Sequence, residues 1–174
     1  LANNIILGRT GAGGASSSGI DSVGSSNRLW VVNNTIDGGN APTSSSAILV
    51  RPDLSGNPST PHLLNNIFTS SSVSMLRSGV AEACGGCDPL ELETNLFDST
   101  LAVYYGDADT SDITTIGNVN GLTDITSVAA NRDGLPLFSG TDPTVTSTYL
   151  RIGAGSAAID AGQMPDFLPE TKEI

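Results

Sequence analysis

Leu63-Leu64-Asn65-Asn66-Ile67-Phe68 shows the pattern that decides the fold: two apolar residues, an asparagine pair and two more apolar residues. The pattern recurs with small changes as Leu1-Ala2-Asn3-Asn4-Ile5-Ile6, Val31-Val32-Asn33-Asn34-Thr35-Ile36 and Leu92-Glu93-Thr94-Asn95-Leu96-Phe97. The four copies begin at residues 1, 31, 63 and 92, which lie 30, 32 and 29 residues apart. A repeat of this length predicts a solenoid in which each copy forms one structural unit.

A second series of strand-like segments lies between these copies. Its members are Gly19-Ile20-Asp21-Ser22-Val23, Ala47-Ile48-Leu49-Val50, Ser74-Met75-Leu76-Arg77 and Leu101-Ala102-Val103-Tyr104. Two or three short strands per unit of about 30 residues, joined by loops rich in Gly, Ser and Asn, are typical of a parallel β-solenoid. We therefore expect an all-β chain whose coils stack on one another.

The recurring asparagines fit this stacking. Equivalent side chains of successive coils lie about 4.8 Å apart, so an asparagine amide can donate to the asparagine on one side and accept from that on the other. Asparagine also tolerates a left-handed backbone at a corner. Asparagine pairs also occur in the turns of ordinary β-sandwiches, but a sandwich does not need the same corner at a constant interval. The predicted ladder residues are Asn3, Asn4, Asn33, Asn34, Asn65, Asn66 and Asn95.

The length of 174 residues fits one domain, 1–174. The repeat weakens after residue 106, so we expect coils over about 1–106 and an irregular closing region over 107–174. The chain starts almost inside a strand-like segment, which suggests that it is the C-terminal part of a longer protein.

The composition excludes two classes of partner. Seven Lys and Arg against 18 Asp and Glu give a net charge of −11, and such a surface repels nucleic acid and anionic lipid head groups. No apolar run is long enough for a membrane span, which argues against membrane insertion within this segment. Short apolar clusters within 38% hydrophobic residues argue against disorder.

The C-terminal part resembles a family of secreted bacterial proteins. Its motif residues are Pro136-Leu137-Phe138, Tyr149-Leu150-Arg151-Ile152 and Gly155-Ser156-Ala157-Ala158-Ile159-Asp160-Ala161-Gly162. They resemble the C-terminal signature of right-handed parallel β-helix proteins of the pectate-lyase-like superfamily, in particular the choice-of-anchor Q surface proteins. Leu135 and Ala157 depart from the family's usual Asp and Pro, and its Asp-x-Asp-Gly-x-Pro-Arg segment is absent. The resemblance implies a right-handed parallel β-helix at the bacterial cell surface or outside the cell, and it implies no reaction.

Cys84-Gly85-Gly86-Cys87 is a C-x-x-C motif. In an exported protein we expect Cys84 and Cys87 to form a disulfide that pins a glycine-rich loop. A redox motif or half of a zinc site are the alternatives, although the only histidine, His62, lies far away in the sequence.

The spacing Asp107-x-Asp109-x-x-Asp112 offers three hard oxygen ligands within six residues. Oxygen ligands suit Ca²⁺ better than softer metals, so Ca²⁺ is the cofactor that the sequence suggests, bound by Asp107, Asp109 and Asp112. The alternative is a solvated acidic loop.

The sequence contains no complete catalytic set. Arg51 and Arg77 fall about one coil apart in the second series and are the nearest candidate bases for a lyase, although both also fit solvated surface positions. His62 has no partner nucleophile at a diagnostic spacing and is expected in a surface loop. We expect Trp30 inside the coil, and we expect one of the adjacent residues Tyr104 and Tyr105 to point outward.

Three hypotheses follow for the function. The first is a non-catalytic extracellular or cell-surface β-helix module for adhesion, display or structural assembly, with a polysaccharide or a cell-surface protein as partner. The second is a polysaccharide lyase or glycoside hydrolase of the same fold. The third is a Ca²⁺-stabilised module whose coil ends self-assemble.

Overall fold

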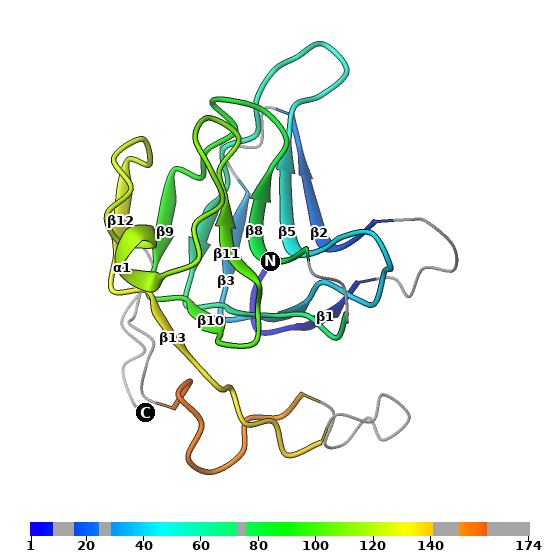
Figure 1. Ribbon diagram of the computed structural model, residues 1–174, viewed down its shortest axis with the longest axis vertical. Helices are drawn as coiled ribbons and strands as arrows, with labels where there is room; N and C mark the ends of the chain where they lie inside the picture. Colours follow the sequence, from blue (N-terminus) through cyan, green and yellow to red (C-terminus); the bar gives the residue numbers. More distant parts are fainter. Residues whose placement is uncertain (9–15, 25–28, 73–75, 141–149, 160–174) are drawn as a thin grey trace, which may run out of the picture.

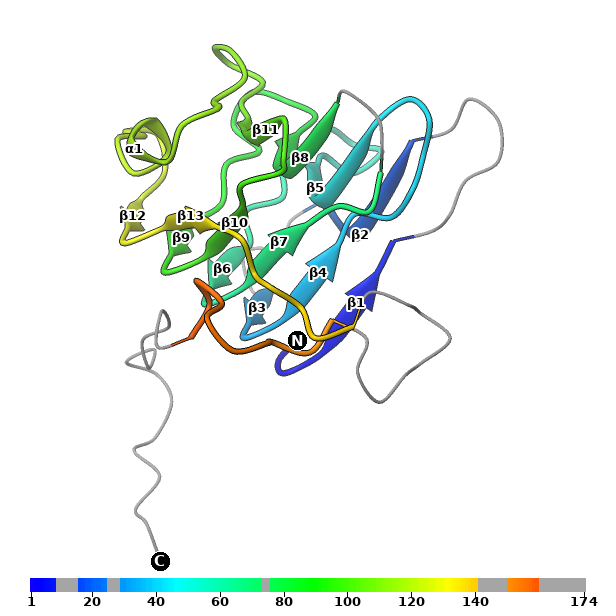
Figure 2. The same cartoon turned by 60° about the horizontal axis from the view of Figure 1, so that its bottom comes forward.

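The computed structural model describes residues 1–8, 16–24, 29–72, 76–140 and 150–159. The chain forms a right-handed parallel β-helix, in which successive coils pass through three parallel sheets (Figures 1 and 2). This confirms the fold class that the repeat and the resemblance predicted.

Each sheet collects the equivalent strands of successive coils. Sheet A contains β3 (Trp30–Val32), β6 (His62–Leu64), β9 (Glu91–Glu93) and β12 (Ser127–Ala129). Sheet B contains β1 (Ile5–Leu7), β4 (Thr35–Asp37), β7 (Ile67–Thr69), β10 (Leu96–Asp98) and β13 (Arg132–Gly134). Sheet C contains β2 (Ser17–Val23), β5 (Ser45–Arg51), β8 (Arg77–Glu82) and β11 (Val103–Gly106). One short helix, α1 (Ile116–Val119), follows β11 in the described part of the chain.

The core consists of apolar side chains stacked in register between coils. One column runs through Val31, Leu63 and Leu92 of sheet A, each fully buried. In sheet B, Phe68 packs edge-to-face against Phe97 with ring centroids 5.0 Å apart. Because each coil is too thin to bury its apolar residues alone, this stacking supplies the hydrophobic stabilisation.

The strands of sheet C change face in the middle. Ala47 and Ile48 are adjacent, yet both are fully buried, and Tyr104 and Tyr105 of β11 are both buried as well. The expectation that one of these tyrosines points outward is therefore wrong, because the strand bends where strict alternation would have turned one side chain to solvent. At the equivalent position of β8, Gly79 leaves room for Phe97, since a Cβ there would lie 2.6 Å from its Cδ1 atom.

The sequence predicted that each corner asparagine both joins the ladder and adopts a left-handed backbone. At the corner between sheets A and B, these two roles fall to two successive residues. The first residue of each corner adopts a left-handed backbone, with φ between 54° and 59° at Asn3, Asn33, Asn65, Thr94 and Ala130. The second residue turns its side chain into the stack. Asn3, Asn33 and Asn65 thus occupy the backbone corner beside the buried ladder, where the Thr94 hydroxyl of the next coil donates to Asn65 Oδ1.

The ladder itself runs through the second residue of each corner. The Nδ2 atom of Asn4 donates to Asn34 Oδ1, Asn34 to Asn66 and Asn66 to Asn95, each over 3.1 Å. Each acceptor oxygen also receives the backbone N–H of the same donor residue. Asn34, Asn66 and Asn95 are each 1% exposed, so these bonds satisfy polar groups that water does not reach.

The stack continues beyond the residue at which the sequence repeat weakens. β12 pairs with β9, and β13 pairs with β10, so coiled structure extends to Gly134 rather than to about residue 106. This coil escaped the pattern because Ser127–Gly134 carries one large apolar residue, Val128. Its Asn131 nevertheless extends the ladder by accepting from Asn95.

Two different segments follow the coils: one covers the end of the stack, and the other packs along its side. At the end of the stack, Asn120 follows α1 and accepts from Asn131, while Val119 of α1 is fully buried in the core. The later segment, yellow to orange in Figure 2, lies beside the corner of sheets A and B, where Ile152 and Ala158 share a pocket with Asn34 and Asn66. Its two motif segments join through an antiparallel bridge between Phe138 and Ile152. Tyr149 and residues 160–162 of the family signature lie outside the described residues.

Candidate functional site

A groove of about 330 Å³ lies on the outer face of sheet C. It follows the bend in the strands, because its lining residues flank the paired inward positions such as Ala47 and Ile48. Hydroxyl groups and small or apolar side chains line most of the groove, and three carboxylates complete it. The lining residues are Ser44, Ser46, Leu49, Leu76, Ser78, Ala81, Glu82, Val103, Gly106, Asp107 and Asp112.

The carboxylates gather where parallel strands end. Glu82 is the last residue of β8, and Asp107 directly follows β11. Because β8 and β11 are parallel neighbours, their carboxyl ends meet at one edge of sheet C. The groove therefore has an acidic end set by the fold, and its remaining surface carries no charged side chain among the lining residues described.

Glu82 is a carboxyl group at this end whose pKa is raised. Its Oε1 atom accepts from the Tyr105 hydroxyl, and its Oε2 atom accepts from the Ala108 N–H over 3.2 Å. Burial, followed by the charges of Asp88 and Asp107, raises the pKa of Glu82 to about 7. Sequence reasoning missed Glu82, although its alignment with Val50 of β5 places a carboxylate beside an otherwise apolar position.

A second carboxyl group shares this environment. Burial, followed by the charge of Asp124, raises the pKa of Asp88, and the neighbouring Glu82 side chain opposes this shift. Burial and the neighbouring Glu82 also raise the pKa of Tyr105. Two carboxyl groups with raised pKa values thus lie at the acidic end, where burial and neighbouring carboxylates favour the protonated forms.

The structure does not bring Asp107, Asp109 and Asp112 together as a metal site. Asp107 is buried and accepts from the backbone N–H groups of Asp109 and Thr110, over 2.7 and 3.0 Å. Asp109 and Asp112 cover different glycines: a Cβ on Gly85 would lie 2.1 Å from Asp109 Oδ1, and one on Gly106 would lie 3.5 Å from Asp112 Oδ1. Within the described ranges, no group of three His, Cys, Asp or Glu side chains is placed to hold a metal ion. Ca²⁺ binding at these residues stays a prediction without a supporting ligand arrangement.

Cys84 and Cys87 are paired as a disulfide just beyond the end of β8. The Cys87 N–H donates to the Cys84 carbonyl over 3.1 Å, and Gly86 adopts φ 76°, so the motif closes a tight turn. Cys87 is fully buried in the core. The pairing anchors the loop that leads from Glu82 to Asp88, the two carboxyl groups whose pKa values are raised.

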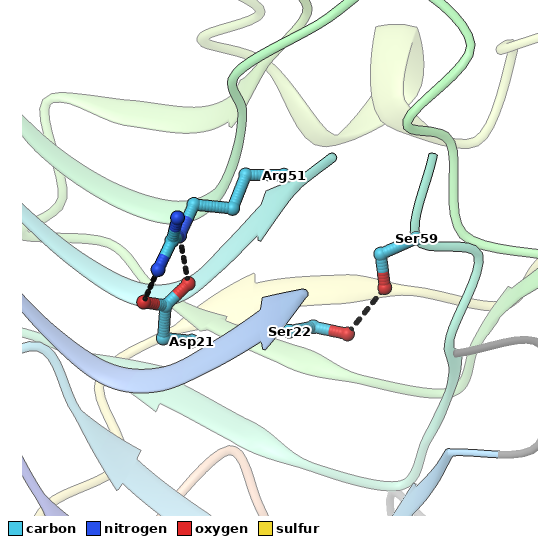
Figure 3. Close-up of polar contacts among 4 residues, drawn as sticks. All are labelled: Asp21, Ser22, Arg51 and Ser59. Atoms are coloured by element: carbon cyan, nitrogen blue, oxygen red, sulfur yellow. Dashed lines mark hydrogen bonds and ion pairs between the residues drawn. The ribbon is translucent and has the colours of Figure 1, made fainter. Parts of the chain in front are cut away.

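Neither candidate arginine lines the groove. Figure 3 shows Arg51 in a two-bond ion pair with Asp21 on the surface of sheet C, with Nε–Oδ1 and Nη2–Oδ2 distances of 2.7 and 2.8 Å. Asp21 raises the pKa of Arg51 further through this hydrogen bond and its charge. Arg77 donates to the backbone carbonyl oxygen of Thr100 over 2.6 Å. Both guanidinium groups are thus held in contacts with the chain itself.

The same figure shows how the loop after β5 is fastened. Ser22 of β2 points away from the ion pair and shares a 2.6 Å hydrogen bond with Ser59 (Figure 3). Ser59 is fully buried, and Ser22 is 2% exposed. This bond tethers the segment between β5 and β6 to the first coil.

The aromatic residues of sheet A form a surface stack. Trp30 and His62 occupy paired positions in β3 and β6, with parallel rings whose centroids are 3.7 Å apart. His62 Nδ1 lies 3.1 Å from Glu91 Oε2 on the next strand. The expectations of a buried Trp30 and a loop His62 are therefore wrong: the inward residue of β3 is Val31, and alignment of the coils in register would have placed Trp30 above His62.

Three parallel sheets wound around one core define the class of this protein as a right-handed parallel β-helix. The chain matches no protein-family model, no curated protein and no solved structure. Among the described residues, no helix has the length and apolar character needed to cross a membrane.

Proposed function

We propose that the chain is a non-catalytic β-helix module of an extracellular or cell-surface protein, akin to the choice-of-anchor Q proteins of the pectate-lyase-like superfamily. The observation that carries this proposal is that charged side chains in and near the groove are held by contacts within the chain. The carboxylates of Glu82 and Asp107 are engaged by hydrogen bonds within the chain, and Arg51 and Arg77 are engaged outside the groove. The groove thus offers a surface for binding in which Glu82 and Asp107 are held by hydrogen bonds and neither arginine is a lining residue.

Its location outside the cell is supported by the Cys84–Cys87 disulfide, because such bonds persist in oxidising compartments. The partner that we propose is a polysaccharide or a cell-surface protein held along sheet C. Serine hydroxyls and carboxylates can hydrogen-bond to the hydroxyl groups of a glycan, and the chain's negative charge disfavours polyanions.

Binding to a glycan array and to bacterial cells tests this proposal. Ala81→Trp fills the groove from its floor, whereas Ala129→Trp adds the same side chain to the exposed end of sheet A. We expect the first variant to lose at least tenfold in affinity and the second to bind as the wild type does. Equal binding by both variants, with unchanged circular dichroism, would rule out the groove as the binding surface.

One observation favours a glycoside hydrolase as a second candidate. Glu82, with a pKa of about 7, lies in the same groove as Asp107 and Asp112, and two carboxyl groups facing one groove are the minimum that a general acid and its partner require. The test is release of new chain ends from neutral and acidic polysaccharides, with Ca²⁺ and with chelator. Release that disappears in Glu82→Gln would establish this candidate, while binding without release in the wild type would support the non-catalytic module.

A further inference from the structure

The asparagine ladder ends at Asn120, which lies outside the coils as the C-terminal cap of α1. Its Oδ1 atom accepts from the backbone N–H and the Nδ2 atom of Asn131, each over 3.0 Å, and its own Nδ2 atom donates to the Asn131 carbonyl over 2.9 Å. Asn131 is 3% exposed, so these bonds satisfy polar groups that water does not reach. Asn120 therefore fastens α1 to the coil of β12 and β13, beside which α1 lies in both views (Figures 1 and 2).

The sequence places a chemically labile dipeptide at this position. Asn120 precedes Gly121, and this is the only Asn-Gly pair in the 174 residues. When glycine follows asparagine, no Cβ hinders the glycine nitrogen from attacking the side-chain amide carbon. The other ladder asparagines precede residues with larger side chains, namely Ile5, Thr35, Ile67, Leu96 and Arg132. The ladder therefore resists this attack at each of those steps and is vulnerable at Asn120.

The folded state holds the two reacting atoms apart. Asn120 has ψ −8°, which eclipses the Gly121 nitrogen with the backbone nitrogen of Asn120. Attack on Cγ closes a five-membered ring and requires the Gly121 nitrogen to eclipse Cβ instead, so the backbone must rotate about ψ. The Gly121 N–H also donates to the Asn118 carbonyl over 3.1 Å, and the Asn120 N–H donates to the Ile116 carbonyl over 3.0 Å. The reaction thus requires α1 to open and Asn120 to leave Asn131.

We propose that Asn120 is a deamidation site whose rate is set by its contact with Asn131, and that its product releases α1 from the stack. The Gly121 nitrogen bonds to Asn120 Cγ, the Cγ–Nδ2 bond breaks, and the amide group leaves as ammonia after water carries to it the proton of the attacking N–H. Water then opens the succinimide to aspartate or isoaspartate, so nothing is oxidised or reduced. Gly121 is exposed and Asn120 half-buried, which gives water access. The inference holds whether or not the groove binds a ligand.

The product cannot replace Asn120 at the end of the ladder. An aspartate at residue 120 still accepts from Asn131, but it has no side-chain N–H to donate to the Asn131 carbonyl, and its second oxygen sets an acceptor against that carbonyl. Isoaspartate also lengthens the backbone by one methylene group at the cap of α1. In both products the buried carbonyl of Asn131 loses this donor. Deamidation therefore weakens the contact between α1 and the coil of β12 and β13.

Peptide mass spectrometry of the chain held in mildly alkaline buffer tests the modification. We expect deamidation at Asn120 and none at Asn118, which is exposed in the same helix but precedes Val119. The folded chain should react at least tenfold more slowly than the chain unfolded in guanidinium chloride, and Gly121→Ala should slow the unfolded chain at least tenfold.

Two variants test control by the fold. Asn131→Ala removes one bond to Asn120 Oδ1, and Thr115→Ala removes the N-terminal cap of α1 while leaving the ladder intact. We expect each variant to speed deamidation of the folded chain at least threefold. Equal rates in the folded and unfolded wild type, or rates unchanged in both variants, would overturn the proposal.

Hydrogen exchange tests the consequence. Asn120→Asp reproduces the aspartate product, and Asn118→Asp adds the same charge to an exposed residue of the same helix. We expect the β12 and β13 amides to exchange at least tenfold faster in Asn120→Asp than in the wild type and at the wild-type rate in Asn118→Asp. Equal exchange in the two variants would show that the product does not release α1 and would overturn that part of the proposal.

Discussion

Replacing Asn66 by alanine tests whether the asparagine ladder holds the coils together. The Asn66 side chain accepts from the backbone N–H and Nδ2 of Asn34, and it donates to Asn95 Oδ1 and the Val31 carbonyl. In Asn66→Ala the Asn34 N–H loses its acceptor at a residue that is 1% exposed, where water cannot replace it. Asn34 Nδ2, Asn95 Oδ1 and the Val31 carbonyl oxygen lose one bond each but keep another partner or a second lone pair.

The expected loss follows from these four bonds. One buried N–H without a partner costs about 1–3 kcal/mol, and each other lost bond costs about 0.5–1.5 kcal/mol. We expect Asn66→Ala to lower the free energy of unfolding by about 5 kcal/mol, a large fraction of the 5–15 kcal/mol that is usual for a domain. Urea titration followed by circular dichroism measures this difference.

Asn4→Ala is the matched control for this prediction. Asn4 belongs to the same ladder but is exposed, and Asn34 Oδ1 keeps the backbone N–H of residue 4 as donor. We expect a loss below about 1 kcal/mol, because water replaces the missing amide. Equal losses in the two variants, or a loss below about 1 kcal/mol in Asn66→Ala, would refute the view that the buried ladder stabilises the stack.

Three further predictions concern the remainder of the fold. Because burial raises the pKa of Glu82 from 4.5 to about 7, the folded state binds this proton more tightly than the unfolded state does. The resulting contribution to stability is lost as the pH rises from about 5 through 7. The stability difference between wild type and Glu82→Gln should therefore change between pH 5 and pH 8, and a constant difference would contradict this assignment. Reduction of the Cys84–Cys87 disulfide should lower the free energy of unfolding by about 2 kcal/mol, as expected for a loop this short. Urea midpoints with and without dithiothreitol measure this difference. Identical midpoints would show that the bond does not constrain the unfolded chain. Gly79→Ala should destabilise the protein by about 1–3 kcal/mol because its Cβ would lie 2.6 Å from Phe97. Gly117→Ala in α1 should stabilise the protein by about 0.5–1 kcal/mol, because a Cβ there has no neighbouring atom within 4 Å. Melting temperatures that change in the same direction in both variants would be inconsistent with this packing.

The sequence predicted the coils because their corners recur at a nearly constant interval. It could not separate the two roles at each corner, since Asn3, Asn33 and Asn65 precede ladder residues that are also asparagines. Thr94 and Ala130 reveal the distinction in the structure: both adopt the left-handed backbone, and the residue after each enters the ladder. What the ladder requires is therefore the second asparagine alone.

The acidic end of the groove was less accessible to sequence reasoning. Spacing alone suggested that Asp107, Asp109 and Asp112 converge, but Gly85 and Gly106 give Asp109 and Asp112 separate places to lie. Glu82 and Asp88 were missed because they belong to different segments, and the loop closed by Cys84 and Cys87 brings them together. Such convergence depends on the path of loops, which a repeat pattern does not specify.

The Trp30–His62 stack makes the protein's single tryptophan a built-in optical reporter of one coil boundary. Its emission depends on contact between β3 and β6 in the first coils, whereas circular dichroism averages over all coils. In a solenoid, whose units interact mainly with their neighbours, the two signals need not change together. A change in Trp30 emission at lower urea than the loss of ellipticity would mean that the stack unravels from its N-terminal end, and coincident transitions would mean that all coils melt as one unit.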